Sequence, residues 1–226
     1  MRRSEYNEGQ AAKRLKVPVT AFRWGRHAGL VPEPDRPRSQ WSRAAVEALD
    51  AVAIAAAMPA EPISGSAAAD RIAAALGTPN IPGAKTRVSA FVVRRFVDRG
   101  LLTDLSANPD GTLHHPAQVD QLCRRPDLAE LVAADAPVGP DQAAERLRVR
   151  RADFDHMVRL GWIRSPQTIE VRFGTSRAGA VNVPLYTTAS VDAVIPAHPE
   201  IDWHLLRTVG KGRRSPLASL RPDLAS

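Results

Sequence analysis

The chain has 226 residues, 44% of them hydrophobic, which is enough for one or two ordinary domains or three small ones. This content excludes a wholly disordered protein. Lys and Arg outnumber Asp and Glu by 31 to 24, and nearly all of the basic residues are arginines. Arginine presents a planar fork that suits phosphates and guanine edges, so the composition favours a nucleic-acid partner. A coding bias towards Ala, Arg and Pro would give the same excess.

The positive charge lies towards the two ends of the chain. Residues 1–62 carry 10 basic and 7 acidic side chains, residues 63–137 carry 8 of each, and residues 138–226 carry 13 and 9. The single cysteine, Cys123, excludes a disulfide within the chain and indicates a reducing compartment. No apolar segment follows Met1, and no stretch is long enough to cross a bilayer. We therefore expect a cytoplasmic, nucleoid-associated protein without a membrane partner.

Residues 9–31, GQAAKRLKVPVTAFRWGRHAGLV, predict two short helices separated by a tight turn. The first helix covers about residues 8–16, and two alanines on its buried stripe let a neighbouring helix approach closely. Pro18 is tolerated because a helix start does not need its amide hydrogen. The second helix covers about residues 19–28 and ends at Gly29, which suits a left-handed cap.

The second of these helices has two chemically different faces. Residues expected in the core, on the helix or just beyond it, are Val19, Phe22, Leu30 and Val31. Residues that share the opposite face, at spacings i, i+3, i+4 and i+7, are Thr20, Arg23, Trp24 and His27. Such a face is what a recognition helix for the DNA major groove requires. The alternative is an ordinary helical hairpin with a solvated charged face.

A proline-rich segment follows and favours an extended, turning loop with Arg36 and Arg38 at its tip. Ser42 is a good N-cap for a helix from Arg43 to about Met58, with Val46 and Leu49 facing inward. The predicted order of elements is that of a small winged helix: helix, turn, helix, short basic loop, Trp41 and helix.

Three stretches of this region resemble the MerR family. They are VPVTAFRW at Val17–Trp24, Gly29-Leu30, and Trp41-Ser42 with Val46 and Leu49. The region is most similar to the truncated MerR-like and excisionase-type winged helices of bacteria. The resemblance implies a winged helix-turn-helix fold and contact of Arg23 and Trp24 with double-stranded DNA, with wing arginines on flanking phosphates or in the minor groove. Two departures are Gly25, in place of a second aromatic residue, and the proline-rich wing. The long dimerising helix and the cysteine-bearing effector site of full-length MerR regulators are not present.

A diverged second repeat follows a short linker at residues 59–64. Residues 88–102 match residues 17–31 at a constant offset of 71, with Arg94 and Arg95 in the places of Arg23 and Trp24. Pro and Gly residues predict a loop insertion at residues 77–87. Ser89 is expected as an N-cap, and the NPDG sequence at residues 108–111 as a hairpin turn. Apolar residues on the second helix, which favour packing against another module, self-association or a protein partner, are Phe91, Val92, Phe96 and Val97.

A third repeat matches the first at a constant offset of 132, from Gln142 to Gly161. Asp153 and Asp155 replace Ala21 and Arg23, and acidic residues on a reading helix repel phosphate. Its basic entrance residues, expected to hold the DNA backbone, are Arg148, Arg150 and Arg151. The alternating stretches 168–173 and 181–186 predict a hairpin wing from which Arg172 and Arg177 project. The alternative to DNA contact is that this hairpin packs on a neighbouring module.

The sequence therefore predicts a mainly α protein with small β-hairpin wings. Three tandem winged helix-turn-helix modules are expected at residues 1–60, 61–136 and 137–197, before a basic tail at residues 198–226 that has a helical piece near residues 201–208. The expected function is sequence-selective double-stranded DNA binding, in transcriptional regulation or as an architectural factor in excision, partition or replication of a mobile element. The alternative is a protein-interaction scaffold with little DNA readout. Residues expected to contact DNA are Thr20, Arg23, Trp24, Arg26, His27, Arg36, Arg38, Arg94, Arg95, Arg150, Arg151, Arg172, Arg177 and Arg213.

No cofactor, metal site or catalytic motif is expected, so the chain reads as a non-enzyme. The adjacent His114 and His115 do not converge as metal ligands would, and a place in the returning wing segment explains them better. We expect Cys123 to be an inert thiol; the alternative is a pKa lowered by the neighbouring Arg124 and Arg125.

Overall fold

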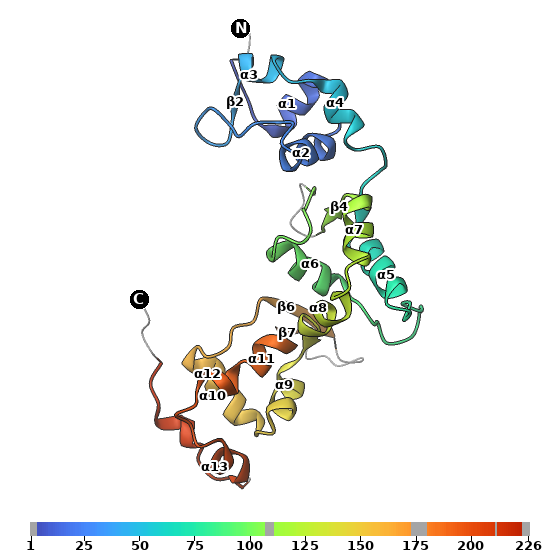
Figure 1. The fold of residues 1–226 in the computed structure, drawn as a ribbon. Coiled ribbons are helices and arrows are strands. Elements are labelled where there is room, and N and C mark those ends of the chain that lie inside the picture. Colours follow the sequence, from blue (N-terminus) through green and yellow to red (C-terminus); the bar gives the residue numbers. More distant parts are fainter. Residues whose placement is uncertain (1–3, 107–110, 173–179, 211, 223–226) are drawn as a thin grey trace. The chain divides into compact units, whose positions relative to one another are not determined.

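A computed structural model describes residues 4–106, 111–172, 180–210 and 212–222, with the backbone alone at residues 171 and 172 (Figure 1). The chain forms mainly helices with small antiparallel sheets, which confirms the predicted class. It divides into two compact units, Met1–Leu128 and Ala129–Ser226. The first unit holds the first two repeats and the second unit holds the third. Among the described helices, none has the length and apolar character that crossing a membrane requires.

The first repeat contains β1 (Glu5–Tyr6), α1 (Glu8–Leu15), α2 (Val19–His27), β2 (Trp41–Ser42), α3 (Arg43–Glu47) and α4 (Ala51–Ala56). The side chain of Asn7 accepts a hydrogen bond from the backbone N–H of Gln10, whose own side chain accepts from the Asn7 N–H. This reciprocal cap starts α1. Gly29 has φ +75°, so the left-handed cap after α2 is confirmed.

The core of this repeat forms where α1 and α2 meet the returning strand. Phe22 and Trp41 are buried with their rings edge to face, 5.3 Å apart at 90°. Val31 is buried as predicted, whereas Leu30 is 40% exposed. Both residues donate their N–H to the carbonyl of Gly25. Because adjacent side chains leave this tight turn in different directions, only one of the two enters the core.

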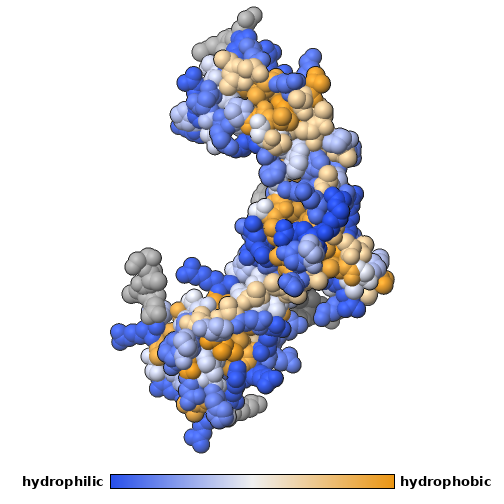
Figure 2. Space-filling model, in the orientation of Figure 1, coloured by the Kyte–Doolittle hydropathy of each residue, from blue (hydrophilic) through white to orange (hydrophobic). Residues whose placement is uncertain are grey.

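The single helix predicted for residues 43–58 is wrong, because α3 and α4 are separate helices. The Asp50 side chain accepts hydrogen bonds from the N–H groups of Val52 and Ala53 and so starts α4 anew. An Asp that binds backbone amides in this way favours a helix start over a helix interior. Ile54 is buried, while Val52 is 79% exposed. Figure 2 shows apolar surface in the region of α4.

The second repeat contains β3 (Ile63–Ser64), α5 (Gly65–Ala75), α6 (Ala90–Asp98), β4 (Leu113–His114) and α7 (Pro116–Cys123), and α8 (Leu128–Ala134) follows it. Residues 77–87 form a loop, as predicted. The Asn80 side chain binds the C-terminal end of this loop. It donates to the Val88 carbonyl and accepts from the Arg87 N–H. Ser89 is at the N-cap position, yet its hydroxyl makes no cap bond. The predicted turn at residues 108–111 lies almost wholly outside the described residues.

The apolar residues of α6 are mostly buried within the first unit. Phe91, Val92 and Phe96 are 7%, 1% and 0% exposed, and α6 packs against α5 within the first unit. Val97 is half-buried. The observation that suggested a protein partner at this helix is therefore explained by the core of the unit itself.

The third repeat contains β5 (Pro137–Val138), α9 (Pro140–Leu147), α10 (Arg151–Leu160), β6 (Gln167–Arg172), β7 (Ala180–Thr187), α11 (Thr188–Asp192) and α12 (Val194–Ala197). Its antiparallel sheet has the strand order β5-β7-β6, so the two predicted hairpin strands are confirmed. The connection between them, residues 173–179, lies outside the described residues.

The C-terminal segment contains α13 (Trp203–Thr208), which the sequence predicts, and a short 3-10 helix η1 (Pro216–Ser219). Two leucines of this basic segment are buried. Leu206 and Leu217 are each 1% exposed, in one core cluster with Phe154 and Met157 of α10. The apolar residues between the basic ones bury against α10, which charge patterning alone does not reveal.

The same backbone register recurs in all three repeats. Tyr6 pairs with Trp41, Ile63 with His114, and Val138 with Tyr186, each in a short antiparallel ladder. An ion pair joins the first helix to the helix after the ladder each time, through Arg14–Glu47, Arg71–Asp120 and Arg146–Asp192. That later helix is capped by the side chain of Ser42, His115 or Thr187. The repeats are therefore alike in structure as well as in sequence.

Candidate nucleic-acid interface

Helix α2 carries most of the predicted DNA contacts. Pro18 precedes it with φ −58° and ψ 145°, and the buried Phe22 fixes the helix against the core. A Cβ on Gly25 would lie 3.2 Å from the Val31 side chain and 3.5 Å from Ile54. A side chain at position 25 would therefore press on Val31 and Ile54 unless these residues shifted. Thr20 is half-buried and His27 is exposed on the opposite side of the helix.

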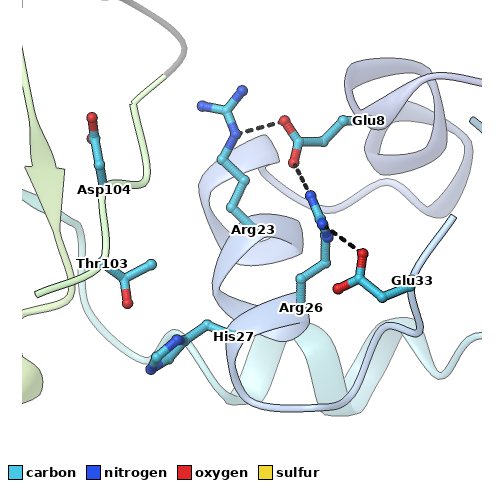
Figure 3. Close-up of a pocket in the computed structure, with 7 residues that line it drawn as sticks. All are labelled: Glu8, Arg23, Arg26, His27, Glu33, Thr103 and Asp104. Carbon is cyan, nitrogen blue, oxygen red and sulfur yellow. Dashed lines mark hydrogen bonds and ion pairs between the residues drawn. The ribbon is translucent and has the colours of Figure 1, made fainter. Parts of the chain in front are cut away.

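Arg23 of α2 makes two hydrogen bonds within the first unit, and Figure 3 shows the one to Glu8. Its Nε donates to Oε2 of Glu8 at 2.6 Å, and its Nη1 donates to the backbone carbonyl of Leu105 at 2.9 Å. The side chain is only 20% exposed. Leu105 belongs to the second repeat, so the guanidinium bridges the two repeats.

Arg26 lies one turn further along α2 and also faces carboxylates. Its guanidinium lies 3.7 Å from Glu8 and 3.1 Å from Glu33, and its Cζ is 5.5 Å from the centre of the Trp41 ring. These ion pairs are partly exposed, so they add little to stability. They do place negative charge beside both α2 arginines.

Trp24 stacks on a histidine of the second repeat. The ring centroids of Trp24 and His115 are 4.1 Å apart at 26°, and His27 lies on Trp24 at 4.9 Å. The expectation that Arg23 and Trp24 share an open outward face is wrong for this conformation. Helical periodicity shows correctly that they point away from the core of their own repeat, but it cannot show that another repeat covers them.

A cavity of about 360 Å³ lies beside this face, between the two repeats of the first unit (Figure 3). Its lining combines basic and acidic side chains with one hydroxyl. The lining residues are Glu8, Arg23, Arg26, His27, Glu33, Thr103 and Asp104. Carboxylates at this density oppose a phosphate, so the cavity in this conformation is not an anion site.

The loop after α2 is the most open basic element of the first repeat. Arg36 forms an isolated bridge with Gln40, and Arg38 and Ser39 turn the chain with φ of 58° and 54°. Both arginines are exposed, as predicted for a loop tip. Among the described residues, Arg38 has neither a hydrogen bond nor an ion pair, so its guanidinium can take an external anion.

In the second repeat, Arg94 and Arg95 are half-buried on α6. Arg95 forms an ion pair with Asp98 at 2.8 Å. The structure thus places them at the positions equivalent to Arg23 and Trp24, with less exposure than the sequence suggests.

In the third repeat, Arg150 is bound inside the second unit. It forms a two-pronged ion pair with Asp153 at 2.7 and 2.8 Å, and its Nη1 donates to the carbonyls of Gly210 and Arg213. Asp153 is fully buried, which corrects its expected place on the reading face. Burial alone raises the pKa of Asp153, but hydrogen bonds from Arg150 and Ser215 bring the pKa below its ordinary value.

Of the other residues predicted to contact DNA in the third repeat and the C-terminal segment, the structure describes the side chains of Arg151 and Arg213. Arg151 is exposed and pairs with Asp141 and Asp155. The Arg213 side chain is exposed. Arg172 lies in β6, but its side chain and the whole of Arg177 lie outside the described residues, so their predicted DNA contacts remain predictions.

The remaining candidate groups have structural explanations. The buried His114 ring lies 3.0 Å from the Thr103 carbonyl and 2.9 Å from the Thr112 hydroxyl. The described residues contain no cluster of metal-binding side chains. Burial raises the pKa of the Cys123 thiol, which agrees with the expected inert thiol and contradicts the alternative of a pKa lowered by arginines.

Sequence reasoning missed the contacts that Glu8, Leu105 and His115 make with α2. Glu8 carries a weak signal, because it starts the helix that precedes the arginines. The Leu105 carbonyl carries none, since any residue supplies a backbone acceptor. No family model matches the chain, and no curated protein or solved structure matches it either.

Proposed function

We propose that this chain is a double-stranded DNA-binding protein built from three winged helix-turn-helix modules of the MerR-like and excisionase-type kind. The observation that carries the proposal is the repetition of one local structure. In each repeat two short helices are braced by a ladder of the same register and by a capped third helix. Proteins use helix pairs braced in this way to place the second helix in the major groove.

Exposed Lys and Arg side chains support this function. Those without a side-chain hydrogen bond or ion pair within the described part of the chain are Lys13, Lys16, Arg36, Arg38, Lys85, Arg87, Arg124, Arg148, Arg164, Arg213, Arg214 and Arg221. They occur in all three repeats and in the C-terminal segment. Phosphate contacts from such residues supply most of the affinity of a DNA-binding protein. Transcriptional regulation, or architectural work in excision, partition or replication of a mobile element, fits three linked modules that bind together.

DNA binding is tested by fluorescence anisotropy with duplex fragments from the genome that encodes the protein, over a series of salt concentrations. We expect binding that weakens steeply with salt. The double variant Arg36→Ala/Arg38→Ala should make the negative slope of log affinity against log salt shallower by about 1 to 2. Arg125→Ala is the matched control, because Arg125 is exposed but already paired with Asp127. Salt-independent binding, or equal slopes in all three proteins, would contradict the proposal.

A protein-interaction scaffold is the second candidate function. The specific observation that favours it is the internal pairing of Arg23, Arg150 and Arg151. A heparin column and a light-scattering mass separate the two functions. Retention by heparin as a monomer favours DNA binding, whereas passage through the column with clear self-association favours the scaffold.

A further inference from the structure

We infer that the second repeat is an internal cover for α2, and that DNA reading by α2 requires the cover to move away. The cover consists of Thr103, Asp104 and Leu105, which precede β4, and His115, which follows it. This inference rests on the proposed DNA-binding function. It adds a conformational step that the function alone does not contain.

The first argument is the occupation of the two side chains that would read DNA. Arg23 donates to the Leu105 carbonyl, and Trp24 has the His115 ring stacked on one face. A base edge or phosphate needs the same guanidinium hydrogens and the same side of the helix. DNA and the cover therefore compete for α2.

The second argument is the chemistry of His115. Its Nδ1 accepts from the N–H of Ala117 and caps α7, while its Nε2 lies 3.1 Å from the carbonyl of Ala57. The equivalent caps in the other repeats are Ser42 and Thr187, whose short hydroxyls suffice. In addition to capping the helix, the His115 imidazole contacts Trp24 and Ala57. The ring is 5% exposed, so it is a built contact and not a surface side chain.

The third argument is that the cover can be displaced. Among the described residues, the cover makes one hydrogen bond and one ring stack to α2, and Thr103 and Asp104 line the cavity beside that helix. DNA would replace the carbonyl with phosphate, which is a stronger acceptor for arginine. Aromatic stacks of this kind contribute modestly. The closed arrangement should therefore lower DNA affinity without abolishing it.

The comparison of repeats supplies the test variant. His115→Thr keeps a side-chain cap on α7, as Thr187 does on α11, but removes the ring from Trp24 and the bond to Ala57. We expect the full-length variant to bind a mixed-sequence duplex about three- to tenfold more tightly than the wild type, the range that one lost aromatic stack allows. Gln121→Ala, an exposed position on the same α7, is the control and should not change the affinity.

A second readout needs no DNA. Hydroxyl-radical labelling of the free protein should oxidise Trp24 more in His115→Thr than in the wild type or in Gln121→Ala. Thermal unfolding followed by circular dichroism checks that the cap is kept.

The possible outcomes separate the cover from the function. Unchanged or weaker DNA binding by His115→Thr, in a wild type that binds DNA, overturns the cover and leaves the proposed function standing. Unchanged labelling of Trp24 also overturns the cover. If neither the wild type nor the variant binds any duplex, the proposed function fails, and with it the role given to the cover.

Discussion

His114 holds the position that Trp41 holds in the first repeat and Tyr186 in the third. Its backbone partner, Ile63, is equivalent to Tyr6 and Val138, so the register is common to all three. The aromatic residues fill this position with apolar surface. The histidine fills it with a polar ring whose two nitrogens lie within hydrogen-bonding distance of oxygen atoms. A fully buried ring of this kind must stay neutral to remain stable.

This burial predicts a pH dependence of stability. Burial lowers the pKa of His114 below its ordinary value of 6.5. As pH falls below about 6.5, the unfolded chain takes up a proton that the folded one does not. The free energy of unfolding should therefore decline from pH 7 towards pH 5. His114→Gln keeps hydrogen-bonding groups but does not titrate, so chemical denaturation should show a smaller decline for it. Parallel pH curves for the two proteins would contradict this.

Asp153 illustrates what sequence reasoning at single residues could and could not predict. Its alignment with Ala21, a residue on the inner side of α2, was the available signal for burial. A buried carboxylate is expected only with a partner. Arg150 is a local partner at the N-cap of the same helix, but Ser215 lies on a segment whose approach is a tertiary feature. The acidic charge therefore suggested an outward face.

At the scale of helices and strands, local signals predicted what local physics determines. The helix pairs, the glycine turns and the hairpin strands follow from periodicity, caps and alternation, and the structure confirms them. The break between α3 and α4 and the docking of η1 on α10 were missed. The break depends on the Asp50 side chain, which binds backbone amides and not solvent. The docking depends on Leu217 of η1, which is buried in the core. The same limit applies to α2, whose cover comes from residues about 80 positions away.

The recurring caps and ion pairs allow a prediction about what stabilises each repeat. Thr187 accepts from the N–H of Ser190 at the start of α11, and a lost cap costs about 1 kcal/mol. The Arg146–Asp192 pair is 46% and 51% exposed, and such pairs contribute about 0.5 kcal/mol or less. Thr187→Ala should therefore lower the free energy of unfolding more than Arg146→Ala does. Urea denaturation measures both, and the reverse order would show that the ion pair is the stronger brace.

The division into two compact units sets the behaviour of the whole molecule. The first repeat has a core cluster around Phe22 and Trp41, and the second unit has another around Phe154 and Tyr186. Each cluster contains a wholly buried valine at the same place in its repeat, Val46 or Val191. Because the clusters belong to different units, damage to one core should destabilise its own unit first.

We predict that these two valines report on separate unfolding transitions. Replacing either by Ala removes buried methyl groups and should cost about 2 kcal/mol. Val46→Ala should lower the melting temperature of the first unit alone, and Val191→Ala that of the second. Differential scanning calorimetry resolves the transitions. Tryptophan fluorescence assigns them, since Trp24 and Trp41 lie in the first unit and Trp162 and Trp203 in the second. If both variants shift a single common transition equally, the two units fold as one cooperative body, which would contradict this prediction.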